Sequence, residues 1–134
     1  MADWLNSILL RINDGSLLPA AYFVGLDCDA ALDSRDGAKD FEAAFIRVSD
    51  EVEPRWKASD VAEPLRSLAE DIRRESFLVV SRAAGQHEIA SYVSDDFDLI
   101  VRARLIGMSN PLLDQLWNAY DGGTFPVGFN PSEH

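Results

Sequence analysis

The chain has 134 residues, a length that suits one domain with its own hydrophobic core and needs no metal or disulfide to fold. Its residues are 47% hydrophobic and 26% charged, as in an average globular protein, which excludes a disordered chain. The formal net charge of −11 repels phosphate backbones and anionic membrane surfaces, so we expect binding to neither nucleic acid nor membrane. We expect residues 1–134 to form a single domain.

The cysteine content and the first residues indicate a cytoplasmic protein. Cys28 is the only cysteine, so no internal disulfide can form. The chain starts with Met-Ala-Asp-Trp, which lacks the basic and apolar regions of a secretion signal. No apolar run approaches the roughly 18 residues that a membrane-spanning helix needs. We therefore expect a soluble protein of a reducing compartment.

Two short helices are predicted near the start of the chain. Apolar residues recur there at helical spacing until the turn-forming residues 13–15. They are Trp4, Leu5, Ile8, Leu9 and Ile12. A second helix is expected from its candidate cap Ser16 to Val24, with Pro19 in its first turn. The segment Leu26–Gly37 is rich in aspartate and carries Arg35 as its only basic residue. We interpret this segment as partly loop.

Two longer helices are predicted in the middle of the chain. The first has an apolar face at helical spacing from Phe41 to Val52, and Pro54 is expected to end it. The second keeps one apolar face from Leu65 to Ala83, with Gly85 as its carboxyl-terminal cap. Asp60 and Glu63 have the spacing of a capping box ahead of this helix, with Pro64 in its first turn.

The segment 87–105 fits two structures. Its apolar residues from Ile89 to Ala103 follow a helical period, whereas Phe97 to Leu105 also alternate as in a strand, with a hairpin turn at residues 94–96. We favour the helix because its period holds over fifteen residues and Gly107 stands where a cap is needed. A hairpin at 87–105, which would give an α+β fold, remains the alternative.

A last helix is predicted to start at Pro111, capped by Ser109 or Asn110, and to end at Gly122-Gly123. The tail from Thr124 to His134 is expected to be extended and partly packed on the helices. Together the elements predict an all-α or mostly α protein, a compact bundle of about five or six helices with an extended C-terminal tail.

Signatures of catalysis and of metal or cofactor binding are missing from the sequence. There is no nucleophile elbow, no glycine-rich phosphate loop and no Cys-x-x-Cys pair. His87-Glu88 begins like a zinc-protease helix, but Ser91 stands where the second histidine is needed. Asp27 and Asp29 lack the glycine-containing loop that follows such aspartates in dehalogenase-type phosphatases. We therefore predict a protein that is not an enzyme and has no cofactor and no metal.

The segment Ser94–Asp98 is the most unusual local feature. It holds three carboxylates, Asp95, Asp96 and Asp98, and no basic residue lies near it in the sequence from Arg82 to Arg102. Carboxylates accept paired, charge-assisted hydrogen bonds from arginine, so this patch suits a basic partner. The alternative is a solvated helix face or an acidic first turn. The basic pairs at 73–74 and at 102 and 104 are expected to bind nearby acids.

The acidic character, the predicted helices and the segments Tyr92–Ile100 and Leu116–Tyr120 resemble small helical bacterial immunity proteins of toxin-delivery and contact-dependent inhibition systems. The resemblance implies a stoichiometric inhibitor of a cognate basic toxin domain, for example a nuclease, with acids that speed the encounter. The contact residues predicted on this basis belong to two acidic segments. They are Asp95, Asp96, Asp98 and Tyr92, and second Asp27, Asp29, Asp33 and Asp36.

Two other classes remain open: a helical adaptor or structural subunit, and a small enzyme that uses a carboxylate pair with or without Mg²⁺. An adaptor would expose an apolar patch of several hundred Å². An enzyme would need acids converging in a pocket with shifted pKa values.

Overall fold

The computed structural model describes residues 1–129, and in these residues all regular structure is helical. The seven helices are α1 (Ala2–Asn13), α2 (Ala20–Gly25), α3 (Cys28–Gly37), α4 (Lys39–Ala58), α5 (Glu63–Ala84), α6 (His87–Leu105) and α7 (Pro111–Asp121). The predicted helical bundle is thus confirmed, with one or two more helices than expected. The segment 87–105 forms one helix, so the alternative hairpin is wrong.

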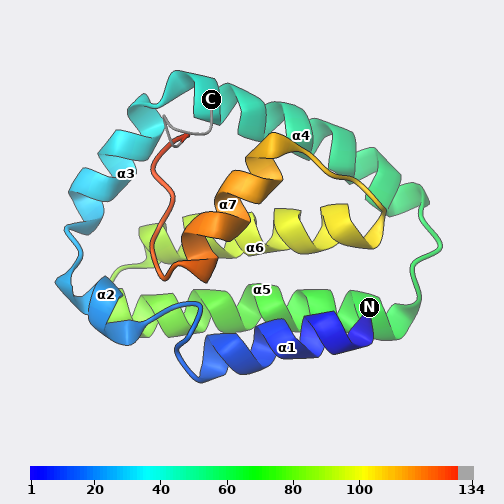
Figure 1. The fold of residues 1–134 in the computed structure, drawn as a ribbon, viewed down its shortest axis with the longest axis horizontal. Coiled ribbons are helices and arrows are strands. Elements are labelled where there is room, and N and C mark those ends of the chain that lie inside the picture. The colour runs from blue at the N-terminus through cyan, green and yellow to red at the C-terminus, as the bar shows by residue number, and fades with distance from the viewer. Residues whose placement is uncertain (130–134) are drawn as a thin grey trace.

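Helices α5 and α6 form the centre of the molecule as an antiparallel pair (Figure 1). Gly85 ends α5 in the left-handed conformation at φ 67°, as the sequence predicted, and the Gln86 side chain then caps α6 by accepting from the Ile89 N–H. From Val93 to Val101 all residues of α6 except Asp95 are buried. A helix with burial on nearly all sides must be enclosed by other helices.

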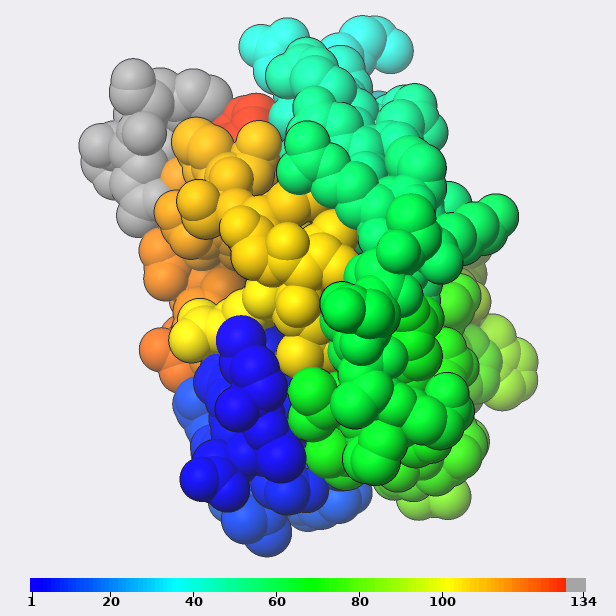
Figure 2. Space-filling model, turned by 90° about the vertical axis from the view of Figure 1, so that its right-hand side faces the viewer, coloured from blue at the N-terminus to red at the C-terminus, as the bar shows by residue number. Residues whose placement is uncertain are grey.

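The remaining helices surround this pair. In Figure 1, α1 lies along α5, α7 crosses α6, and α4 arches over the opposite side, with α3 at one end of the arch. Figure 2 shows the end of α6 and the start of α7, in yellow to orange, lying between α1 in blue and α4 in green. The core is therefore formed by α6 and the inward faces of its neighbours.

The segment Leu26–Gly37, interpreted as partly loop, forms helix α3 instead. The Asp27 side chain caps it by accepting from the Ala30 N–H at 3.0 Å. Ala31, Leu32 and Arg35 form its buried face. The apolar pattern was hidden because an arginine occupies one of the three inward positions.

Two predicted helix boundaries are also corrected. Helix α4 continues through Pro54 to Ala58, because the proline is on the exposed side of the helix, where solvent can hydrogen-bond to the carbonyl that loses its donor. Asp60 does not cap α5: the N-cap is Ala62, which provides no side-chain hydrogen bond. Helix α7 agrees with the prediction at both ends: Asn110 is its N-cap, with Oδ1 accepting from the Leu112 N–H at 2.8 Å, and the helix ends just before Gly122.

The predicted packing of the tail is confirmed over residues 124–129. Phe125 is buried, and the Phe129 ring meets Phe41 edge-on at a centroid distance of 5.3 Å. The rest of the predicted tail, residues 130–134, lies outside the described residues.

Candidate partner-binding surface

Asp96 lies at the centre of the fold rather than on its surface. Its side chain is fully buried, and both of its oxygens are bonded. Arg35 donates from Nη1 to Oδ2 at 2.7 Å and from Nη2 to Oδ1 at 2.6 Å, and the Tyr120 hydroxyl donates to Oδ2. This group joins α3, α6 and α7, so Asp96 holds the helices together and is not presented to a partner in this structure.

Arg35 is enclosed almost as completely as Asp96. Its guanidinium lies within 5.5 Å of the centres of four aromatic rings. These rings belong to Phe41, Phe45, Tyr92 and Phe125. Burial acts to lower the pKa of Arg35, but the hydrogen bonds and the charge of Asp96 outweigh it and raise the pKa above its ordinary value. The arginine therefore stays charged inside the core.

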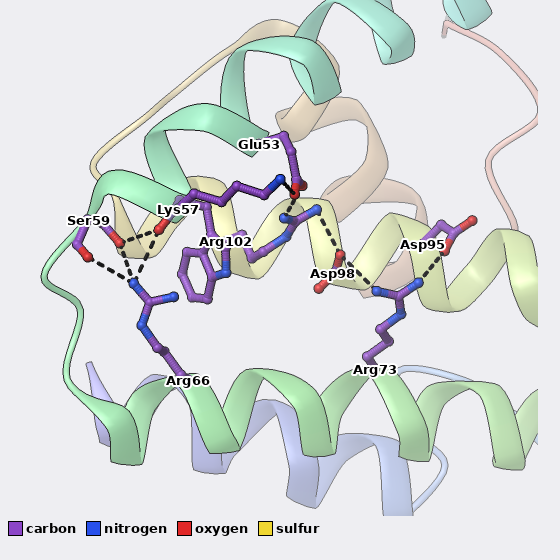
Figure 3. A network of polar contacts seen from close by, with 9 residues as sticks. Glu53, Lys57, Ser59, Arg66, Arg73, Asp95, Asp98 and Arg102 are labelled. Atoms are coloured by element: carbon purple, nitrogen blue, oxygen red, sulfur yellow. Dashed lines mark hydrogen bonds and ion pairs between the residues drawn. The ribbon is translucent and has the colours of Figure 1, made fainter.

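Asp98 is also turned inward, into a chain of ion pairs that joins three helices (Figure 3). Its Oδ2 accepts from Arg102 Nη2 at 3.0 Å and lies 3.5 Å from Arg73 Nη1. Arg102 Nη1 reaches Glu53 of α4 at 2.7 Å, and Arg73 Nη2 reaches Asp95 at 3.2 Å. The expectation that the basic residues bind nearby acids is thus confirmed for Arg73 and Arg102.

The pKa values in this chain of ion pairs shift in opposite directions. Hydrogen bonding to Arg102 lowers the pKa of Glu53, whose side chain is half exposed. Burial raises the pKa of Asp98, although the charges of Arg102 and Arg73 oppose that rise. The difference follows from burial, because the Asp98 side chain is only 7% exposed.

The three carboxylates of Ser94–Asp98 therefore point in different directions. Asp95 is exposed and shares Arg73, whereas Asp96 and Asp98 are buried. Their basic partners lie at positions 35, 73 and 102, and helix packing brings these together from three elements. Sequence inspection missed Arg35 and Glu53 because the partners are 61 and 49 residues away from the groups they bind.

The exposed acids of α3 form a more coherent surface. Asp29, Asp33 and Asp36 are exposed and spaced by four and three residues, which places them on one side of the helix. We call these three residues the α3 acidic stripe. Arg35, the only basic residue of α3, points into the core, so it does not neutralise the stripe. Asp27 lies just before the stripe and is exposed, but it is engaged in capping α3.

Two side chains hold the α3 acidic stripe against the rest of the molecule. Gln86 donates to Asp29 Oδ1 at 3.0 Å, and the Tyr92 hydroxyl donates to Asp36 Oδ1 at 2.7 Å. The hydrogen bond to Asp36 is the main reason that the pKa of Tyr92 is raised to about 12. The same tyrosine ring packs against the guanidinium of Arg35. Tyr92 thus connects the exposed stripe to the buried ion pair.

His87 and the acidic residues are also candidates for catalytic or metal-binding groups. His87 Nδ1 lies 2.9 Å from Ser81 Oγ, and its ring is stacked on Phe77. Within residues 1–129, no three His, Cys, Asp or Glu side chains are grouped so as to hold a metal ion. No helix in the described part of the chain is long and apolar enough to cross a membrane.

Comparison with known proteins places the chain in a family. A search among curated proteins finds no significant match. The model of a family described as Immunity protein PIM1 matches residues 7–127, which include α2 to α7 entirely and most of α1. The match confirms the resemblance to immunity proteins that the acidic, helical sequence indicated. Because it spans far more than half of the sequence, the chain belongs to the immunity protein PIM1 family.

Proposed function

We propose that this protein binds a cognate toxin domain through a basic surface of that domain and neutralises it by forming a one-to-one complex, without catalysis. The observation that carries the proposal, beside membership in an immunity family, is the α3 acidic stripe. It offers three carboxylates on one side of a helix whose only arginine is buried.

Electrostatics explains how such a surface works. A net charge of −11 draws a basic toxin toward the protein, and a local stripe of carboxylates orients it on arrival. A nuclease fits best as the target, since the groove that binds its substrate backbone is basic and carboxylates can occupy the places of phosphates. Covering that groove blocks the substrate path.

The eight residues predicted from the sequence take different parts in this proposal. Asp29, Asp33 and Asp36 contact the toxin directly, and Tyr92 and Asp95 extend the surface onto α6. Asp27 maintains the start of α3 as its cap. Asp96 and Asp98 act from inside, because they fix α3, α5 and α7 on α6 and so hold the surface in shape.

The proposal is tested with the purified chain as bait in lysate of its source organism, at low and moderate salt, with identification of what is retained by mass spectrometry. A retained basic domain is then expressed in cells with and without this chain. We expect one-to-one binding and protection of growth. Asp33→Lys should weaken both, whereas Asp60→Lys, an equal charge change in the linker between α4 and α5, should leave them nearly unchanged. If no toxin is neutralised by the wild-type chain, the proposal fails.

A further inference from the structure

A small apolar pocket lies away from the α3 acidic stripe, where α1, the end of α6 and α7 meet. Its volume is about 280 Å³. Two tryptophans that pack against each other line it: the Trp4 and Trp117 rings are 6.5 Å apart between centroids and tilted by 51°. Met108 and Leu113 complete the apolar walls. Figure 2 shows the side of the molecule on which α1 approaches the segment between α6 and α7.

The rim of the pocket is polar. The guanidinium of Arg104 lies over the Trp4 ring, 4.6 Å from its centroid, which fixes one side of the opening. Asp114 also lines the pocket, is exposed, and makes no ion pair with any residue of the described part of the chain. Gly107, at φ 77°, provides the sharp turn after α6 that brings Met108 to the pocket.

We infer that this pocket receives one hydrophobic side chain, aromatic or long aliphatic, from a basic segment of the toxin, and that it controls how long the complex lasts. The inference rests on the proposed function. The volume lies at the lower limit of pockets that hold small ligands, and a single large side chain fills it. Tryptophan and arginine are among the residue types that dominate binding energy at protein interfaces, and methionine is enriched there.

The charges around the pocket indicate which residues of the toxin should lie next to the inserted side chain. Asp114 at the rim and Asp3, which precedes Trp4, are both exposed acids. A lysine or arginine beside the inserted side chain would pair with Asp114, whose charge is otherwise open to solvent. Arg104 keeps N–H groups that can donate to backbone carbonyls of the toxin.

The pocket and the stripe are separate enough to be tested apart. The stripe meets α6 near its start, at Tyr92, and the pocket meets it near its end, at Arg104. Twelve residues of helix correspond to about 18 Å along the axis. An interface of standard size, about 800 Å² on each partner, can span that distance. Exposed charges mainly set the association rate, whereas a buried anchor mainly sets the dissociation rate.

The test compares binding kinetics of pocket variants with the toxin domain that the wild-type chain neutralises. Ser109→Tyr places a ring at the mouth of the pocket without removing any core atom, since Ser109 is an exposed lining residue. Ser67→Tyr, on the exposed side of α5, is the matched control. Trp117→Leu removes one wall as a second variant, and circular dichroism checks that each variant is folded. We expect both pocket variants to dissociate at least tenfold faster with association rates within twofold of wild type, and the control to bind normally.

Tryptophan fluorescence provides an independent measurement. In a Trp56→Phe background the tryptophan emission of this chain comes only from Trp4 and Trp117, and the toxin domain is used with its own tryptophans replaced by phenylalanine. We expect the toxin domain to shift this emission to shorter wavelength and to protect it from quenching by acrylamide.

The failure of this inference is distinguishable from failure of the proposed function. If Ser109→Tyr and Trp117→Leu keep wild-type kinetics while Asp33→Lys weakens binding, the pocket has no role and the toxin-binding function stands. If the wild-type chain neutralises no toxin, the proposed function itself is wrong. If sedimentation shows a wild-type dimer that Ser109→Tyr converts to a monomer, the pocket belongs to a second copy of the chain, and the inference is overturned.

Discussion

Asp96 and Arg35 form a buried ion pair, and removal of either partner alone should strongly destabilise the protein. Both side chains are almost fully buried, so the two charges are shielded from solvent. Desolvating two charges is expensive, so such a pair adds little stability compared with a well-packed apolar pair, but removal of one partner leaves a bare buried charge. The pair therefore serves to select one arrangement of α3 and α7 on α6.

We predict that Asp96→Asn lowers the free energy of unfolding by about 3–5 kcal/mol, because Arg35 keeps its charge and loses its bidentate partner. Urea denaturation followed by circular dichroism measures the loss. Tyr120→Phe, which removes one hydrogen bond to the same carboxylate, should cost only about 1–3 kcal/mol.

The double variant Arg35→Met with Asp96→Leu is the control for this pair. It removes both charges together and keeps the volume apolar, so its loss should be smaller than the sum of the losses from the two single variants. Additive losses would contradict the view that the two charges depend on each other.

Glu53 gives a pH-dependent prediction. Its pKa is lowered mainly by hydrogen bonding to Arg102, so its ion pair contributes stability above the pKa of the unfolded chain and loses it as the pH falls through the pKa of the folded one. Arg102→Gln should raise the pKa of Glu53 toward its ordinary value and reduce the acid-side loss of stability. A carbon NMR titration of the carboxyl group measures the shift.

Lys57→Gln is the matched change for this titration. Lys57 lies 3.6 Å from Glu53 but is largely exposed, and it lowers the pKa of Glu53 less than Arg102 does. A larger shift from Lys57→Gln than from Arg102→Gln would contradict the geometry in Figure 3.

At the scale of elements, the proline inside helix α4, Pro54, gives a prediction about helix stability. The residue lacks an N–H to donate to the Asp50 carbonyl, the acceptor one turn earlier in the helix, yet α4 continues to Ala58. Pro54→Ala restores that donor, while the greater freedom of the unfolded chain offsets part of the gain. We expect the free energy of unfolding to rise by about 1–2 kcal/mol.

Thermal unfolding measures this change. The control Arg55→Ala, also exposed on α4, should change stability by less than about 0.5 kcal/mol. A destabilised Pro54→Ala protein would show that the proline itself stabilises α4 in the native structure.

The elements that sequence periodicity predicted well are those with apolar faces. The helices α1, α5, α6 and α7 each carry such a face over several turns, and the caps at Gly85 and Asn110 are local signals. Helix α3 was missed because its inward positions hold alanine, leucine and arginine while its other positions are acidic or small. Its burial depends on Asp96, which no local pattern indicates.

The two acidic segments of the candidate site were also predicted with different success. The segment Asp27–Asp36 was predicted as an acidic surface, and its aspartates are exposed. The segment Asp95–Asp98 has an equally acidic sequence, but two of its three carboxylates are buried. The difference is tertiary: α6 is enclosed by other helices, whereas α3 lies at the edge of the fold. Charge density in the sequence therefore indicated an interaction surface but could not distinguish outward from inward acids.

At the scale of the whole molecule, four of the ten arginines are held by groups far from the α3 acidic stripe or inside the core. Arg35, Arg73 and Arg102 each pair with acids of α6, and Arg66 is held by carbonyls at the end of α4. The stripe on α3 keeps its charge because no arginine is paired with it in the described structure. The stripe thus presents exposed negative charge on α3, where it can orient an approaching basic domain.

This distribution predicts a specific salt dependence of toxin binding. Steering by exposed charges is screened over about 8 Å at physiological salt, so the association rate constant should fall steeply as salt rises, while the dissociation rate constant changes little. Asp29→Lys together with Asp33→Lys should lower the association rate at low salt by about tenfold and flatten its salt dependence. Stopped-flow mixing with the neutralised toxin domain measures both.

A second double variant with the same net charge as Asp29→Lys with Asp33→Lys tests whether the position of the acids or the total charge sets the association rate. Asp50→Lys together with Asp60→Lys changes two exposed acids of α4 and of the linker that follows it, and so alters the overall charge equally. If steering depends on the stripe, this control keeps most of the salt dependence. Equal slowing of both double variants would mean that only the total charge of −11 matters, and the toxin would then approach the molecule without a preferred side.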